Sequence, residues 1–278
     1  MKKIITILAF LIPVFSFSQQ HSCCKKSATE SFAQFATNEK FSAAHLDPEP
    51  LTYIAEKGTM ISIKCSDGNL GKAFEVKADS ASDNWVFVFH EWWGLNDYIK
   101  REAENLAKEM PKVNILAIDL YDGNVATTAE TAQKIMESVK DERARAIIQG
   151  AIQHVGSTAK IGTLGWCFGG GWSLQASLIA GKQSVACVMY YGFPETDTTK
   201  LKTLNSGVLG IFGTKDKWIT PEVVSTFEKN MKYLNKKIII KSYDADHAFA
   251  NPSNPKYDKD ATIDAHRLAL AYLKSRLR

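Results

Sequence analysis

The sequence has little net charge and no long apolar run, and both shortages narrow the classes of protein to consider. Its 34 lysines and arginines face 30 aspartates and glutamates, so the formal net charge is only +4. A balance this close to neutral gives no reason to expect nucleic acid or an anionic membrane as a partner. The apolar stretch at residues 4–17 is too short to span a bilayer comfortably and contains Pro13. No internal repeat or low-complexity tract is visible.

The apolar stretch instead indicates a secretory signal. It follows Lys2 and Lys3 and ends in the small-residue segment Ser16-Phe17-Ser18, where a signal peptidase could cleave. We therefore expect residues 1–18 to be removed and the mature chain to be periplasmic or secreted, without membrane attachment. An uncleaved membrane anchor is the alternative.

Cysteine is scarce, and the five residues of this type cannot all form pairs. Cys187 lies within an apolar run, which favours a packing role. The adjacent Cys23 and Cys24, near His21, leave a disulfide, a soft metal ion or lipidation as alternatives. Because two adjacent cysteines and one histidine do not complete a usual metal site, we expect no metal and no cofactor.

The pattern after residue 56 predicts one α/β domain, residues 57–278, behind an irregular polar lead-in at residues 19–56. Apolar runs alternate with helical periodicity, and the later runs are apolar throughout, as expected for parallel strands buried on both faces. The first two expected strands form a hairpin. The expected strands cover residues 59–65, 71–78, 85–90, 114–120, 160–166, 186–191, 207–213 and 237–243.

A candidate nucleophile stands between an expected strand and an expected helix. The segment Gly165-Trp166-Cys167-Phe168-Gly169 is typical of a nucleophile elbow, with cysteine where serine usually stands. A thiol at the first turn of a helix feels the positive end of the helix dipole, which favours the reactive thiolate. The alternative is that Cys167 is a small buried residue in a glycine-rich turn.

An acid and a base follow in the chain order that this elbow requires. Asp216 comes just after the expected strand 207–213, and His247 just after the last one. Such a carboxylate can orient the imidazole and stabilise its charged form. Each residue has an alternative role: Asp216 as a turn former, His247 as a solvated loop residue, or Asp244 or Asp246 as the orienting acid.

The segment His90-Glu91-Trp92-Trp93-Gly94 follows the expected strand 85–90. In an elbow-containing fold, this loop supplies the second backbone N–H of the oxyanion hole. We therefore assign the two donors to the amides of Trp92 and Phe168. The indoles of Trp92 and Trp93 are expected to pack in the core, a role that is compatible with lining a substrate pocket.

Four stretches together resemble the dienelactone hydrolase family of α/β-hydrolases, over about residues 59–275. They are Val88–Asn96, Gly165–Gly170, Gly213–Asp216 and His247–Phe249, with Tyr257 downstream. The resemblance implies an α/β-hydrolase fold with a mostly parallel eight-stranded sheet flanked by helices. It also implies a triad of Cys167, Asp216 and His247, with Glu91 contacting the resting thiol and taking its proton when substrate binds.

The chain departs from the family pattern at one substrate contact. Where family members place an arginine to hold the substrate carboxylate, this sequence has Asn251. Arg143 and Arg145 lie in a segment resembling the region of the family's second such arginine. Trp93, Asn251, Arg143 and Arg145 are therefore the candidate substrate-binding residues.

These observations predict a monomeric thiol-dependent hydrolase of a small ester or lactone, acting through an acyl-enzyme. Only about fifteen residues separate the expected strands 186–191 and 207–213, so we expect no large lid and an open cleft. A thioesterase or acyltransferase with the same triad remains an alternative. An exported binding or redox protein with an inert Cys167 is another.

Overall fold

The computed structural model describes residues 28–278, except residues 37, 44 and 46. The expected signal segment, residues 1–18, and the pair Cys23 and Cys24 lie outside the described residues. Within the described part of the chain, no helix is both long and apolar enough to cross a bilayer.

Eight strands form one sheet in the order β1-β2-β4-β3-β5-β6-β7-β8. The pairs β1–β2 and β2–β4 are antiparallel, and the other neighbours are parallel. Each strand begins and ends within two residues of its expected range, so the mostly parallel eight-stranded sheet is confirmed. The strands are β1 (Thr59–Lys64), β2 (Leu70–Val76), β3 (Asn84–Phe89), β4 (Asn114–Asp119), β5 (Lys160–Trp166), β6 (Ser184–Tyr190), β7 (Gly207–Gly213) and β8 (Ile238–Tyr243).

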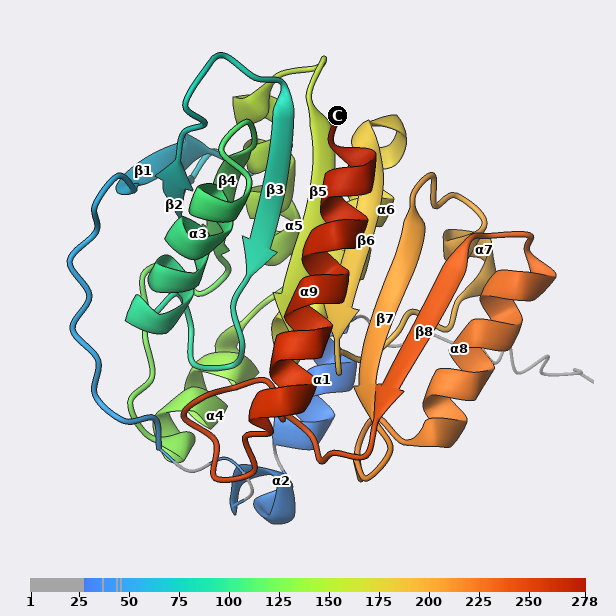
Figure 1. Ribbon diagram of the computed structural model, residues 1–278. Coiled ribbons are helices and arrows are strands. Elements are labelled where there is room, and N and C mark those ends of the chain that lie inside the picture. The colour runs from blue at the N-terminus through green and yellow to red at the C-terminus, as the bar shows by residue number, and fades with distance from the viewer. Residues whose placement is uncertain (1–27, 37, 44, 46) are drawn as a thin grey trace, which may run out of the picture.

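Burial explains why the middle strands are apolar throughout. All residues of β4 are buried, as are all residues of β3 except Asn84. In Figure 1, α3 (Asp97–Glu109) and α9 (Lys259–Arg276) cover one face, while α5 (Asp141–Val155) and α6 (Phe168–Ala180) lie behind the sheet. The other helical elements are α1 (Ala28–Ala36), α2 (Glu39–Ala43), α4 (Ala129–Ser138), α7 (Thr198–Leu201), α8 (Pro221–Tyr233) and a 3-10 turn at Gly181–Gln183.

Local capping fixes where helices begin at the edge of the sheet. The Asn96 side chain accepts a hydrogen bond from the Ile99 N–H, so α3 begins directly after the loop that follows β3. The Asp258 side chain accepts from the Ala261 N–H in the same way and starts α9. Each cap satisfies a backbone donor that the first helical turn would leave unpaired.

Two short helices occupy part of the lead-in that we expected to be irregular. In Figure 1, α1 and α2 lie at the end of the molecule toward which the arrowheads of β5, β6, β7 and β8 point. Their apolar side chains explain this position, because Phe32 and Phe41 are buried in the main core. The lead-in therefore packs against the carboxyl edge of the sheet, where ligands and chemistry gather in folds of this class.

Candidate active site

Cys167 lies at a sharp turn between β5 and α6, with φ 54° and ψ −118°. This left-handed conformation is strained for a residue other than glycine. Gly165 and Gly169 permit the turn, because a Cβ atom on either would overlap a neighbouring backbone carbonyl. The backbone N–H of Phe168 acts to lower the pKa of the Cys167 thiol, against the larger effect of burial. The expected strand–turn–helix arrangement is present, with the thiol at the N-terminal end of α6.

His247 connects the thiol to Asp216. Its Nε2 lies 3.3 Å from Cys167 Sγ, and its Nδ1 lies 2.6 Å from Asp216 Oδ2. The other oxygen of Asp216 accepts hydrogen bonds from the Trp218 and Ile219 N–H groups, at 2.8 and 2.9 Å. Because the carboxylate is held from both sides, it fixes the imidazole with Nδ1 as donor and Nε2 facing the sulfur.

The two competing acids have other partners. Asp244 forms an ion pair with Lys215 at 2.9 Å, and Asp246 forms one with Lys256 at 3.0 Å. Asp216 is therefore the acid that contacts His247. It also lies between Cys167 and His247 in the sequence, which is the order that the elbow requires.

The charges of the three residues depend on one another. Burial raises the pKa of the Cys167 thiol, and the negative charge of Glu91 adds to this effect while His247 opposes it. Burial alone would lower the pKa of His247, but Asp216 raises it well above its usual value. For Asp216, burial favours the neutral acid, whereas His247 and two backbone N–H groups keep the pKa below normal. The resting site therefore favours a neutral thiol beside an imidazolium–carboxylate pair.

Glu91 lies in the loop after β3 and is buried. One of its oxygens accepts a hydrogen bond from the Tyr191 hydroxyl at 3.3 Å, and the other from the Asn251 amide. Burial raises the pKa of Glu91 to about 7, with His247, Tyr191 and Asn251 acting against burial. A carboxyl group with this pKa can both take and release a proton near neutral pH.

Cys167 is 0% exposed, so the expectation of an open cleft is wrong at this point. Phe41 of α2 contacts the ring of Trp92 at 5.4 Å between centroids, Trp218 at 5.1 Å and His247 at 5.8 Å. The covering side chain of Phe41 comes from the lead-in. It does not come from an insertion between β6 and β7, because that segment contains only the short helix α7.

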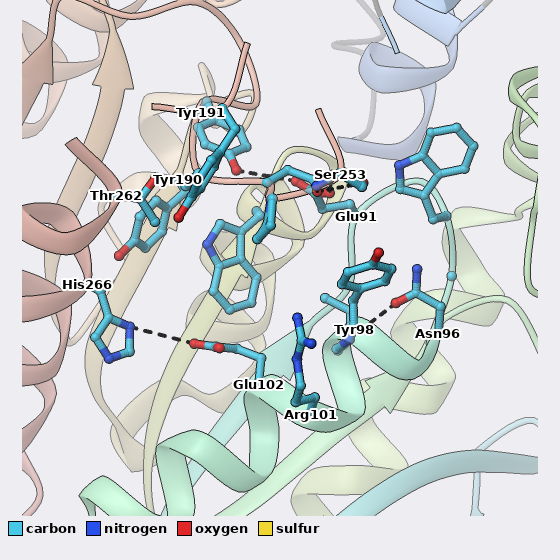
Figure 2. Close-up of a pocket in the computed structure, with 18 of the residues that line it drawn as sticks. Glu91, Asn96, Tyr98, Arg101, Glu102, Tyr190, Tyr191, Ser253, Thr262 and His266 are labelled. Atoms are coloured by element: carbon cyan, nitrogen blue, oxygen red, sulfur yellow. Dashed lines mark hydrogen bonds and ion pairs between the residues drawn. The ribbon is translucent and has the colours of Figure 1, made fainter. Parts of the chain in front are cut away.

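A cleft of about 330 Å³ lies beside the triad, on the side of Glu91. Trp93 and Asn251 line it, as the sequence suggests for substrate-binding residues, together with Tyr191. Figure 2 shows Arg101 of α3 extending into the same group of side chains, between Glu102 and Tyr98. The guanidinium of Arg101 lies over the Tyr98 ring, 5.2 Å from its centroid. The cleft therefore combines aromatic walls with a positive charge.

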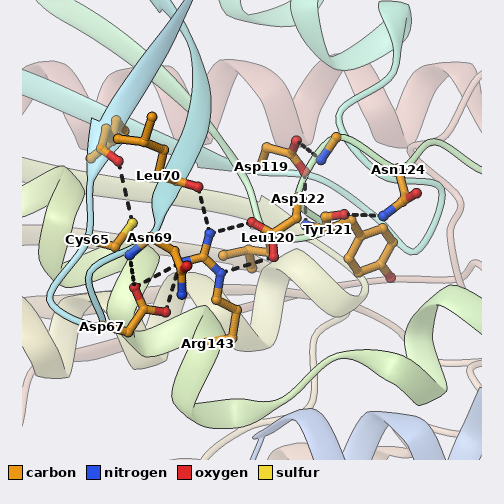
Figure 3. A network of polar contacts seen from close by, with 12 residues as sticks. Cys65, Asp67, Asn69, Leu70, Asp119, Leu120, Tyr121, Asp122, Asn124 and Arg143 are labelled. Carbon is orange, nitrogen blue, oxygen red and sulfur yellow. Dashed lines mark hydrogen bonds and ion pairs between the residues drawn. The ribbon is translucent and has the colours of Figure 1, made fainter.

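Arg143 and Arg145 do not line this cleft, contrary to the substrate-binding role suggested from the sequence. Arg143 forms ion pairs with Asp67 and Asp122 and donates a hydrogen bond to the Leu70 carbonyl, as Figure 3 shows. These contacts tie α5 to the β1–β2 turn. Arg145 pairs with Asp141 within α5 and reaches Gln175 of α6. Both guanidinium groups are thus used in packing between elements.

Two residues near the site had no place in the sequence-based interpretation. His45 follows α2, is 5% exposed and lies beside the triad, with its ring centroid 5.5 Å from that of His247. Nothing in the sequence indicated that Arg101 lines the cleft, because an arginine in a helix usually faces solvent. The signal available for His45 was its spacing of four residues from Phe41, which places both on one side of a helical turn.

In the part of the chain that the structure describes, one group of metal-ligating side chains comes together. It consists of His45, Cys167 and His247, whose ligand atoms all lie within 4.8 Å of one another. Cys65 and Cys187 are buried free thiols elsewhere, and the expected packing role of Cys187 is confirmed.

Comparison with known proteins finds relatives that cover most of the chain. Residues 72–277 match the description of the dienelactone hydrolase family. The chain is 25% identical to carboxymethylenebutenolidase 1 of Cupriavidus pinatubonensis over 75% of its length and 92% of the relative. It is 27% identical to a carboxymethylenebutenolidase of Pseudomonas sp. strain P51, over 68% of its length and 83% of the relative.

A solved structure supports the fold. A dienelactone hydrolase-like promiscuous phosphotriesterase from metagenomic libraries superposes with a TM-score of 0.66 at 21% identity. The match covers 80% of this chain and 100% of the other. The same α/β fold is therefore present in both proteins.

Proposed function

The chain belongs to the dienelactone hydrolase family, whose members hydrolyse lactones and esters, and we propose that it acts through an acyl-enzyme on Cys167. The observation that carries this proposal is the chain of contacts from Asp216 through His247 to the thiol, at 2.6 and 3.3 Å. A nucleophile, a base and an orienting acid within hydrogen-bond reach are what such catalysis requires.

In the first half of the reaction, the thiol proton passes to Glu91 and the sulfur attacks the substrate carbonyl. The pKa of Glu91, about 7, supports this transfer, because the carboxylate is a ready acceptor near neutral pH. The backbone amides of Phe168 and Trp92 donate to the developing oxyanion. His247, charged beside Asp216, then gives its proton to the leaving oxygen as the carbon–oxygen bond breaks and the thioester forms.

In the second half, His247 is neutral and acts as a base toward water. Water attacks the thioester carbonyl, its proton goes to Nε2, and the carbon–sulfur bond breaks to release the acid. The carboxyl group of Glu91 then returns its proton to the sulfur. All groups regain their starting protonation states, so the cycle balances.

For the substrate, we propose a small lactone or ester that bears a carboxylate. The proposal is supported by Arg101, which places a guanidinium group in the cleft beside Glu91. Asn251, which occupies the position where the family pattern has a cation, donates a hydrogen bond to Glu91. A guanidinium can pair with a carboxylate through two parallel hydrogen bonds. The aromatic residues Trp93 and Tyr191 suit the flat ring of an unsaturated lactone.

The proposal is tested by hydrolysis of a small activated ester under reducing conditions. Cys167→Ala should lower kcat by several orders of magnitude, because no attacking group remains. Cys65→Ala is the matched control, since it removes another buried free thiol and should keep activity. Retained activity in Cys167→Ala would show that the reaction uses another group.

A further inference from the structure

His45 places an unpaired nitrogen beside the catalytic pair. Its Nδ1 lies 2.8 Å from the Phe41 carbonyl oxygen, and because a carbonyl can only accept, Nδ1 carries the proton. Nε2 then holds a lone pair, and it has no hydrogen-bond partner among the described residues although His45 is only 5% exposed. A buried acceptor without a donor costs about 1–3 kcal/mol, so this nitrogen has an unmet need for a partner.

Among the described residues, no proton donor meets this need of His45. The buried ring lies beside His247, with 5.5 Å between the ring centroids, and the Asp216 carboxylate is already hydrogen-bonded to His247. A neutral imidazole with a free lone pair is the form that binds metal ions.

The three nearby ligand atoms suit a tetrahedral metal ion. One ring nitrogen of each histidine and the Sγ of Cys167 lie within 4.8 Å of one another, with 3.3 Å between the Nε2 of His247 and the sulfur. Bonds of about 2.0–2.1 Å to nitrogen and about 2.3 Å to sulfur place tetrahedral ligands roughly 3.3–3.6 Å apart. The His247–Cys167 pair already has this separation, and a shift of roughly 1 Å brings His45 to it.

The outer contacts also match those of a metal site. Each imidazole donates its other N–H to an oxygen, His45 to the Phe41 carbonyl and His247 to the Asp216 carboxylate. Such contacts fix the tautomer and aim the ligating nitrogen in metalloproteins. One thiolate and two imidazoles select a borderline or soft divalent ion, such as Zn²⁺, over Mg²⁺ or Ca²⁺.

We propose that His45, Cys167 and His247 bind one soft divalent metal ion, represented by Zn²⁺, and that this ion reversibly blocks hydrolysis. On binding, the thiol proton and the Nε2 proton of the charged His247 leave to solvent, a sulfur–metal bond forms, and both imidazoles give their lone pairs without any redox change. The thiolate and the Asp216 carboxylate balance the two positive charges of the ion. The blocking effect rests on the proposed function, because the ion occupies the proposed nucleophile and base together.

Direct metal binding tests the site. The probe is Co²⁺ alone, added to the full chain in which Cys23→Ser, Cys24→Ser and His21→Ala remove three other side chains that could bind a metal ion. We expect one equivalent of Co²⁺ to give a thiolate-to-cobalt charge-transfer band, which one equivalent of Zn²⁺ abolishes. Absence of this band in the parent protein would overturn the proposal.

Variants of His45 test the ligand set. His45→Gln should weaken Zn²⁺ binding by at least roughly tenfold, whereas His45→Cys, which keeps a ligand atom, should restore binding. His154→Ala is the control, because it removes a histidine that pairs with Glu75 away from the site. Equal affinity in His45→Gln and the parent would overturn the role of His45, and failure of His45→Cys to bind more tightly than His45→Gln would do the same.

Activity measurements separate this proposal from the proposed function. Zn²⁺ should inhibit ester hydrolysis by the parent, a chelator should reverse the inhibition, and His45→Gln should need at least roughly tenfold more Zn²⁺. Activation by Zn²⁺ would contradict the block. With chelator present, activity in Cys167→Ala would refute the cysteine mechanism and leave the metal site standing. Absence of the cobalt band in the parent protein would refute the metal site and leave the cysteine mechanism standing.

Discussion

The side-chain amide of Asn251 donates a hydrogen bond to the carboxylate of Glu91, although the two residues lie 160 positions apart in the sequence. Both residues line the cleft, and Glu91 also influences the charge of the Cys167 thiol. Asn251 therefore holds in place the carboxylate that lies between the cleft and the Cys167 thiol. Its amide nitrogen already has a partner in the substrate-free protein.

The first prediction concerns the charge of Glu91. Above pH 7 its carboxylate is ionised and disfavours a nearby thiolate, so Glu91→Gln should lower the apparent pKa of the Cys167 thiol. The same change removes the proposed proton acceptor and should slow hydrolysis. The measurement is the pH dependence of Cys167 alkylation, with the other cysteines replaced.

Asn251→Asp is the informative companion to this experiment. It replaces the amide donor with a second carboxylate and should move the thiol pKa in the opposite direction, upward. An unchanged or higher thiol pKa in Glu91→Gln would leave Glu91 with a purely structural role.

The second prediction concerns substrate charge. If Arg101 pairs with a substrate carboxylate, Arg101→Ala should lower kcat/KM for anionic lactones about ten- to a hundredfold and leave neutral esters nearly unchanged. Arg143→Ala is the control, because its ion pairs with Asp67 and Asp122 lie elsewhere and its loss should affect stability instead. An equal loss for both substrates in Arg101→Ala would remove the charge-recognition role.

The strands of the sheet and the order of the three triad residues could be predicted from the sequence. Apolar runs such as Val86–Phe89 are buried in the middle of the sheet, where local pattern and tertiary environment agree. Asp216 and His247 could be chosen because the carboxyl ends of parallel strands meet at one edge. Their contacts with each other and with Cys167 follow from that topology.

The burial of Cys167 beneath side chains of the lead-in could not be predicted from local pattern. Phe41 and His45 sit in a short polar segment, and their burial depends on distant partners, Trp92 and Trp218. The substrate-binding role expected for Arg143 was wrong for the same reason, because the acids that pair with it, Asp67 and Asp122, belong to other elements. Periodicity identifies which face of a helix is buried, but not what lies opposite a charged side chain.

The third prediction tests the cover. Phe41→Ala should speed alkylation of Cys167, because it opens the aromatic contact over a thiol that is otherwise fully buried. Phe227→Ala is the comparison, a buried phenylalanine of α8 in a separate cluster. That variant should lose about 3–5 kcal/mol of unfolding free energy without selectively exposing the thiol. Equal alkylation rates in Phe41→Ala and the parent would show that α2 does not limit access.

The fourth prediction concerns Glu104, which anchors the chain before β1. Its carboxylate accepts hydrogen bonds from the Gly58 and Lys57 N–H groups at 2.6 and 2.7 Å, and also from the Tyr53 hydroxyl. Burial would raise the pKa of Glu104, but these donors lower it to about 2. Because this pKa lies below the value of about 4.3 for an unfolded chain, the stabilisation is complete above pH 5 and is lost as pH falls toward 2.

Urea unfolding at several pH values measures this effect. Glu104→Gln should cost about 2 kcal/mol at pH 7, and the difference from the parent should shrink between pH 5 and pH 3. Glu130→Gln, which removes an exposed ion pair with Lys134, should change stability by well under about 1 kcal/mol. A difference that stays constant with pH would contradict the anchoring role of the charged carboxylate.

The acyl-enzyme on Cys167 is tested most directly by trapping the acyl group. The protein is mixed with an activated ester, quenched in acid before the first turnover is complete, and digested for peptide mass analysis. We expect one added acyl mass on Cys167, formed at least as fast as kcat, with Cys65 and Cys187 unmodified. Active protein that carries no acyl group on Cys167, or carries it on another residue, would contradict the proposed mechanism.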